Sequence, residues 1–138
     1  MRALTALATG ALLLASCETA FVGRAPGGRY ALVEVDGNAP PFTLDPADHC
    51  PTRILGGHFD LDAVARRFEM VIDRTGHCSP PRDLVERGSY LRRGGRLELE
   101  AAQPDGATRA LVATESGSTI ALEYDELRLR FRQVAPKR

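Results

Sequence analysis

The stretch TIALEYDELRLRFRQV, residues 119–134, shows most clearly how this chain folds. Apolar side chains recur at every second position on both sides of Asp125-Glu126, namely Ile120, Leu122, Tyr124, Leu127, Leu129 and Phe131. Arg128, Arg130 and Arg132 occupy the alternate positions of the second half. A period of two is that of a β-strand, so each half predicts a strand with one face in a core and the other in water. Asp125-Glu126 is the expected turn between them.

Similar segments recur upstream, at residues 29–35, 42–44, 53–61, 66–74, 84–91, 96–101 and 108–114. Turn-forming residues such as Asp36-Gly37-Asn38 separate them, and Gly56-Gly57 predicts a sharp bend within one of them. Short strands at regular spacing are typical of a sandwich or a barrel. We expect an all-β fold, an antiparallel up-and-down barrel of about eight strands, because closure removes exposed strand edges.

Residues 60–74 allow a second interpretation. Phe68, Met70 and Ile72 alternate as in a strand, which is the interpretation we favour. A helical period of 3.6 residues is matched by Leu61, Val64, Ala65 and Phe68. The sequence alone leaves the helix open as the alternative.

The N-terminal segment has the pattern of a signal peptide: Arg2, an apolar run, and then Leu14-Ala15-Ser16-Cys17. The apolar run is shorter than the roughly 20 residues that a membrane span needs. Its last four residues resemble the lipobox of bacterial lipoproteins, which implies acylation of the Cys17 thiol and cleavage before it. The alternative is an ordinary secretory signal, cleaved near Ser16, with an incidental cysteine.

The lipoprotein resemblance also implies a location. In that family an Asp after the lipidated cysteine is associated with retention in the inner membrane, whereas this chain has Glu18. We therefore expect the outer membrane, with the domain in the periplasm. The expected organisation is a signal peptide at 1–16, a lipid-anchored tether at 17–28, a β-domain at 29–134 and a C-terminal tail at 135–138.

Once Cys17 is assigned to lipid, Cys50 and Cys78 remain. Two remaining thiols in an oxidising compartment predict one disulfide. Each follows a histidine, His49 or His77, and two histidines with two thiolates form a set that zinc or copper accepts. Adjacent residues of an extended chain point to opposite sides, and neither pair has the C-x-x-C spacing of metal sites, so the disulfide is favoured.

Composition and motifs exclude several classes of function. The chain has 18 basic and 18 acidic residues, and no basic stripe interleaved with aromatic residues, which argues against nucleic-acid binding. It lacks a phosphate-binding loop, a G-x-S-x-G elbow and an H-E-x-x-H motif, so we predict no enzyme, no cofactor and no metal. His58 is expected to be a solvated strand residue. We expect four strand glutamates to point outward and to pair with neighbouring arginines on the surface: Glu98, Glu100, Glu115 and Glu123.

The order of elements over residues 29–134 is similar to that of the small lipocalin-like domains of bacterial lipoproteins. The resemblance rests on five segments: Tyr30–Gly37, Gly56–Leu61, Gly88–Tyr90, Gly95–Leu99 and Leu127–Arg132. Such domains commonly have Asp-Gly between the third and fourth strands, where this chain has Ala63-Val64-Ala65. The resemblance implies a fold and no reaction.

Three functions are consistent with such a barrel. In the first, the opening of the barrel binds a small apolar ligand and is lined by Tyr30, Phe59, Phe68, Tyr90 and Tyr124. The alternative is that these residues fill the interior themselves, as is usual in a small barrel. An envelope inhibitor or assembly factor would present a loop to a partner protein, and Ser116-Gly117-Ser118 is faintly like the Ser-Gly loop of lipid-anchored lysozyme inhibitors. A metal-handling lipoprotein would use His49 and His77.

Overall fold

The computed structural model describes residues 27–76, 78 and 82–135, and this part of the chain contains strands and no helix. The strands are β1 (Gly28–Val35), β2 (Phe42–Leu44), β3 (Thr52–Asp62), β4 (Arg67–Gly76), β5 (Leu84–Arg93), β6 (Arg96–Ala102), β7 (Thr108–Ser116), β8 (Thr119–Tyr124) and β9 (Leu127–Gln133). The predicted signal peptide, Cys17 and His77 lie outside the described residues, as do most of the predicted tether and tail.

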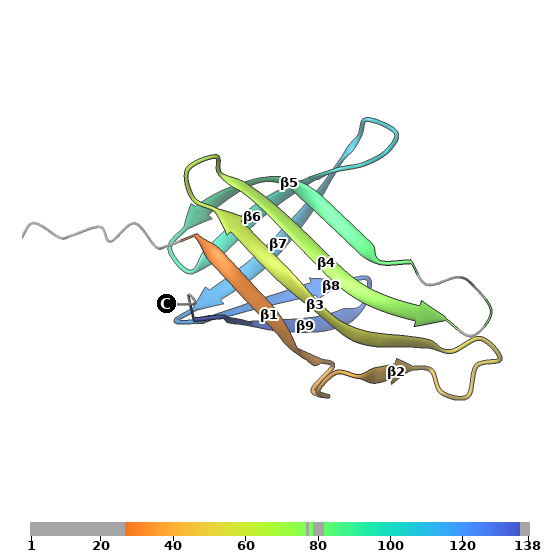
Figure 1. The fold of residues 1–138 in the computed structure, drawn as a ribbon. Coiled ribbons are helices and arrows are strands. Elements are labelled where there is room, and N and C mark those ends of the chain that lie inside the picture. The colour runs from red at the N-terminus through yellow and green to blue at the C-terminus, as the bar shows by residue number, and fades with distance from the viewer. Residues whose placement is uncertain (1–26, 77, 79–81, 136–138) are drawn as a thin grey trace, which may run out of the picture.

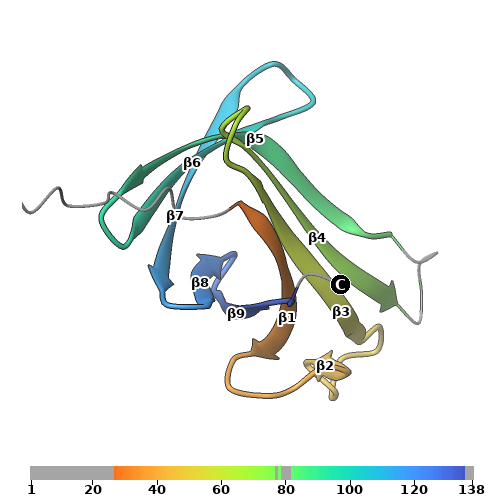
Figure 2. The same ribbon diagram turned by 60° about the vertical axis from the view of Figure 1, so that its left-hand side comes forward.

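The strands form a closed antiparallel barrel (Figures 1 and 2). Consecutive strands from β3 to β9 pair with one another, and β1 closes the barrel by pairing with both β9 and β3. The short β2 is an extra strand that pairs with Thr52–Ile54, the part of β3 that β1 does not reach. The predicted eight-stranded up-and-down barrel is therefore confirmed, with one strand added.

The helical alternative for residues 60–74 is wrong. β3 and β4 pair along almost their whole length, from Thr52 opposite Gly76 to Asp62 opposite Arg67. Residues 63–66 form the turn, in which Asp62 Oδ1 accepts the backbone N–H groups of Val64 and Ala65, each at 2.9 Å. Val64 is 84% exposed, so it belongs to no buried apolar face and its fit to a helical period is accidental.

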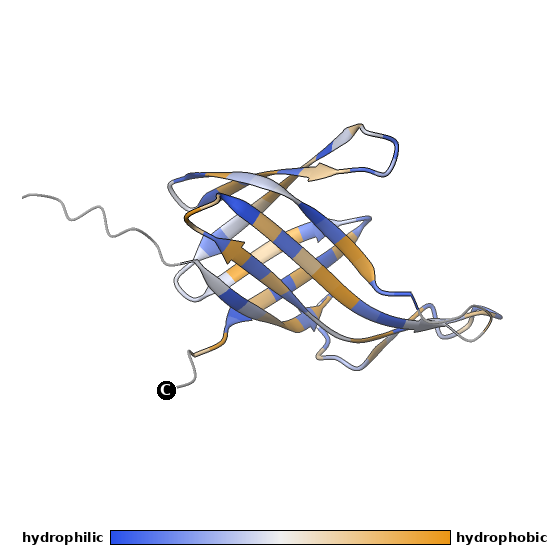
Figure 3. Ribbon diagram, turned by 45° about the horizontal axis from the view of Figure 1, so that its top comes forward, coloured by the Kyte–Doolittle hydropathy of each residue, from blue (hydrophilic) through white to orange (hydrophobic). Residues whose placement is uncertain are grey.

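The barrel is filled by the side chains that point inward. Apolar and polar residues alternate along the strands (Figure 3), and the inward set forms one core contributed by β1 and β3–β9. The Phe59 ring lies 5.7 Å from that of Phe68 and 5.6 Å from that of Phe131, measured between centroids. An eight-stranded barrel is just wide enough for its own side chains to fill it, and this one follows that rule.

Two strands approach each other unusually closely at Gly88. A Cβ atom added there would lie 1.8 Å from the Glu100 carbonyl oxygen of β6. A backbone oxygen cannot move aside as the end of a flexible side chain can, so only glycine fits this inward position of β5.

Because neighbouring strands run in opposite directions, the barrel has two distinct ends (Figure 1). One end contains the start of β1, the end of β9 and the β3–β4, β5–β6 and β7–β8 turns, and we call it the N-terminal end. The other contains the β1–β2, β2–β3, β4–β5, β6–β7 and β8–β9 connections, and we call it the disulfide end.

Candidate functional site

The predicted disulfide is confirmed. Cys50, in the β2–β3 loop, is bonded to Cys78, which follows β4, with 5.3 Å between their Cα atoms. The bond ties together two loops of the disulfide end. Because the two sulfur atoms are bonded to each other, they are not available as thiolate ligands, and a metal site that uses both thiolates is wrong for this state.

The five aromatic residues considered as ligand-lining all lie inside the barrel, where they are between 0% and 7% exposed: Tyr30, Phe59, Phe68, Tyr90 and Tyr124. Phe59 and Phe68 stack on each other in the middle of the core. Every one of the five belongs to the same buried cluster as the aliphatic side chains around it. Their packing therefore supports the interpretation in which these residues fill the lumen.

A buried polar cluster lies inside the barrel toward the disulfide end. Glu86 of β5 is only 6% exposed, and its carboxylate accepts hydrogen bonds from the Tyr124 hydroxyl at 2.5 Å and from Gln103 Nε2 at 3.2 Å. Arg109 Nη1 lies 3.7 Å from the same carboxylate and donates to the Tyr124 hydroxyl at 3.1 Å. Arg109 also covers the Tyr124 ring at 4.3 Å and pairs with Asp125 at 2.5 Å. The buried charge is thus fully compensated.

Sequence reasoning missed Glu86, although a signal was present. Leu84, Glu86, Gly88 and Tyr90 share one face of β5, so an inward Tyr90 implies an inward Glu86.

A second polar pair lies inside the barrel at the N-terminal end. Arg92 donates from Nη2 and Nε to Glu115 Oε2 at 2.9 and 3.1 Å, and both side chains are mostly buried. Glu115 was predicted to face outward, and this is wrong, because it continues the inward row of β7 that contains Leu111 and Ala113. Each end of the apolar core therefore carries an inward-pointing ion pair.

The three tyrosines of the chain are all in the core, and all have a raised pKa. Burial is the main cause for each, and for Tyr124 the hydrogen bond to Glu86 and its negative charge bring the pKa to about 12. A phenol whose pKa is higher in the folded than in the unfolded chain stabilises the fold below pH 10, and this stability is lost as the pH rises toward 12.

We therefore expect tyrosinate absorbance of the native protein to rise only above pH 10, with the last group titrating near 12. Tyr124→Phe should remove that last step and flatten the decline in stability above pH 10, measured by urea unfolding. The chain has no Trp, and Phe and the disulfide do not titrate, so the change in near-ultraviolet absorbance over this pH range reports deprotonation of these three tyrosines. Coincident titration curves for Tyr124→Phe and the native protein would contradict the assignment.

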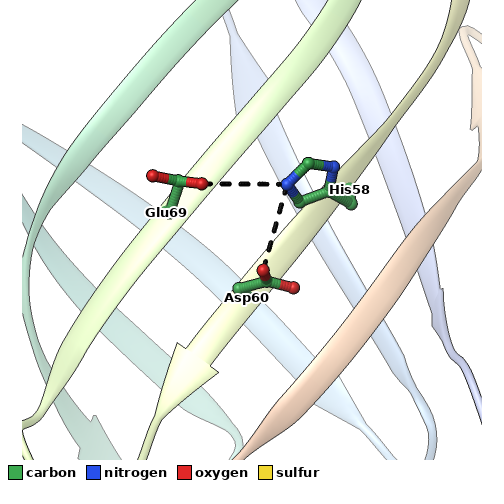
Figure 4. A group of neighbouring side chains, drawn as sticks. All are labelled: His58, Asp60 and Glu69. Carbon is green, nitrogen blue, oxygen red and sulfur yellow. Dashed lines mark ion pairs between the residues drawn. The ribbon is translucent and has the colours of Figure 1, made fainter.

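A third cluster lies on the outer wall (Figure 4). His58 faces outward as expected, but its side chain is only 27% exposed, with Nε2 3.9 Å from Asp60 and 3.8 Å from Glu69. One imidazole and two carboxylates form a donor set that divalent metals accept. Arg29 already makes a two-pronged pair with Asp60 and lowers the pKa of that carboxyl, and Arg87 pairs with Glu69. The cluster is thus a charge network in which arginines neutralise both carboxylates.

Comparison of the sequence with protein-family models, with curated proteins and with solved structures gave no match. Across residues 27–76, 78 and 82–135 there is no helix with the length and apolar character needed to span a membrane. What the structure establishes is an all-β barrel with lipocalin-like topology, crosslinked between two loops at one end.

Proposed function

We propose that this protein is a lipid-anchored lipoprotein of the cell envelope, held in the outer membrane through an acylated Cys17. Its barrel is an interaction module that binds a cationic partner protein through the disulfide end. It catalyses no reaction, and it uses neither a cofactor nor nucleic acid.

The distribution of charge carries this proposal. The connections at the disulfide end hold seven carboxylates, Asp36, Asp45, Asp48, Asp83, Asp105, Asp125 and Glu126. Arg82 is the only arginine or lysine among the described residues of those connections. The whole chain has a formal charge of zero, so the acidity is local. A patch of one sign steers and selects partners of the opposite sign.

Two further features support binding through loops rather than in the lumen. The aromatic residues that would line a ligand site pack into the core, which argues against an apolar ligand. The Cys50–Cys78 bond holds two of the acidic loops together. A loop that is ordered before binding loses less entropy when its partner arrives.

A cationic enzyme such as lysozyme is one partner of this class, so an inhibitor role is a special case of the proposal. In that case the acidic turns are the contact surface. Ser116-Gly117-Ser118 forms the β7–β8 turn at the opposite end of the barrel, so it is not part of the proposed surface.

Site-specific photocrosslinking in the cells that make the protein tests the partner. A photoreactive residue at exposed Ala47, in the β2–β3 loop, should crosslink a basic protein, whereas the same residue at exposed Ala110, on the wall of β7, should not. Asp45→Asn with Glu126→Gln should lower the yield several-fold. The matched variant Glu69→Gln with Glu98→Gln removes two carboxylates from the outer wall of β4 and β6, away from the disulfide end, and should leave the yield unchanged.

Equal crosslinking from Ala47 and Ala110, or an acidic protein at Ala47, would refute the partner assignment. The anchor is tested separately by feeding cells an alkyne-labelled palmitate. The native chain should carry the label and sediment with membranes, and Cys17→Ser should lose both properties. A labelled Cys17→Ser chain would refute the anchor.

A further inference from the structure

The N-terminal end of the barrel is as basic as the disulfide end is acidic. Its turns and the adjoining strand ends contain seven arginines, Arg29, Arg66, Arg67, Arg92, Arg93, Arg96 and Arg132. The acidic residues in the same segments are Asp62 and Glu115. The barrel thus carries opposite charges at its two ends, although its net charge is zero.

Several of these guanidinium groups are directed to solvent and incompletely neutralised. Arg66 and Arg67, in and after the β3–β4 turn, are exposed and enter no ion pair within the described part of the chain. Arg93 and Arg96 flank the β5–β6 turn, are 69% and 60% exposed and share the single carboxylate of Glu98. Two neighbouring turns of this end therefore carry excess positive charge.

An apolar side chain lies at the tip of one of these turns. Val64 is 84% exposed, the highest value among the large exposed apolar residues described, and one residue, Ala65, separates it from Arg66 and Arg67. An apolar tip next to arginines suits the boundary of a phospholipid bilayer, where the tip enters the headgroup layer and the arginines contact phosphates.

The proposed anchor places a membrane near this end. β1 begins at Gly28 at the N-terminal end, and Cys17 precedes Gly28 by eleven residues. Eleven residues span at most about 40 Å when fully extended. The barrel is therefore restricted to a thin layer above the bilayer, and only its orientation remains to be set.

We propose that the N-terminal end docks on anionic phospholipid through Arg66, Arg67 and Val64. This inference rests on the anchor proposed above to bring the membrane close, but it predicts binding without the anchor. Docking in this orientation turns the acidic disulfide end away from the anionic surface and toward the periplasm. The basic end of the barrel then contacts the membrane while the acidic end is free to bind the partner protein.

Vesicle sedimentation tests the docking with the chain from Glu18 onward, which lacks Cys17; residues 28–133 close the barrel by themselves. It should bind vesicles of phosphatidylcholine mixed with phosphatidylglycerol, and not vesicles of phosphatidylcholine alone. Binding should be lost at ~1 M salt. Arg66→Gln with Arg67→Gln should weaken it roughly 10- to 30-fold.

Arg53→Gln with Arg128→Gln is the matched control, because it removes two exposed arginines from strand positions near the disulfide end and should leave binding unchanged. Equal loss in both variants, or equal binding to both kinds of vesicle, would overturn the proposal. If the chain from Glu18 onward fails to bind anionic vesicles while the full chain is labelled by palmitate at Cys17, the docking is refuted and the anchor stands. Vesicle binding by the shorter chain without palmitate labelling of the full chain refutes only the anchor.

A fluorescent reporter locates the contact without removing any charge. The chain contains no Trp, so Val64→Trp provides a single probe at the tip. Its emission should shift to the blue on addition of the anionic vesicles, whereas Val85→Trp, on the outer face of β5 near the disulfide end, should not respond. A shift at both positions, or at neither, would contradict docking through Val64.

Discussion

Removal of the disulfide is expected to lower the free energy of unfolding by about 3 to 4 kcal/mol. Cys50 and Cys78 are 28 residues apart, and a crosslink over that distance removes much of the conformational freedom of the unfolded chain. A domain of this size has a total stability of only about 5 to 15 kcal/mol. The crosslink therefore accounts for a large fraction of the stability of the barrel.

The measurement is urea unfolding of the native protein and of the Cys50→Ser, Cys78→Ser double variant, which leaves no unpaired thiol in the domain. Both proteins are measured with and without a reducing agent. The free energies of unfolding of the two proteins should differ under oxidising conditions and be equal under reducing conditions. A difference that persists after reduction would show that the serines, rather than the lost crosslink, destabilise the fold.

The same comparison bears on the proposed function. The Cys50–Cys78 bond joins loops at the edge of the barrel, not strands of its core. If the loops bind a partner, the double variant at a temperature where it is still folded should lose crosslinking at Ala47 while its barrel remains closed. That result would separate the order of the loops from the closure of the barrel.

The strands could be predicted from the sequence because each has an inward and an outward face. The alternation in residues 119–134 extends over two strands without interruption, and the structure follows it residue by residue. The region around Val64 was ambiguous because a turn between two strands places apolar residues at helical spacing by chance. The pairing of β3 with β4 decides between the strand and the helix, and this pairing cannot be read from a local sequence pattern.

The polar interior was hidden from the sequence for a different reason. An acidic residue in a strand is usually exposed, so Glu115 was predicted to face outward and Glu86 was not singled out. Each is buried because its partner comes from a strand or turn remote in sequence: Arg109 and Tyr124 for Glu86, Arg92 for Glu115. The side-by-side pairing of β5, β6, β7 and β8 brings these groups together on the inner face of the sheet.

Replacement of Arg109 by methionine should destabilise the barrel by about 2 to 3 kcal/mol, because it leaves the buried Glu86 carboxylate without its nearest cation. The full cost of an unpaired buried charge is higher, but Arg109 is one-third exposed and solvent compensates part of its loss. Methionine preserves much of the packing over the Tyr124 ring. Arg128→Met, at an exposed position of β9, is the matched control and should change stability by less than about 0.5 kcal/mol.

A double-mutant cycle with Glu86→Gln separates the loss of the ion pair from the loss of the arginine itself. When Gln replaces Glu86, no buried charge remains, so Arg109→Met should then cost at least about 1 kcal/mol less than it does in the native chain. Tyr124 and Gln103 remain as hydrogen-bonding partners for the amide. Additive effects of the two substitutions would mean that Arg109 stabilises the barrel through Asp125 and the Tyr124 ring alone, and that the buried carboxylate is satisfied by its hydrogen bonds.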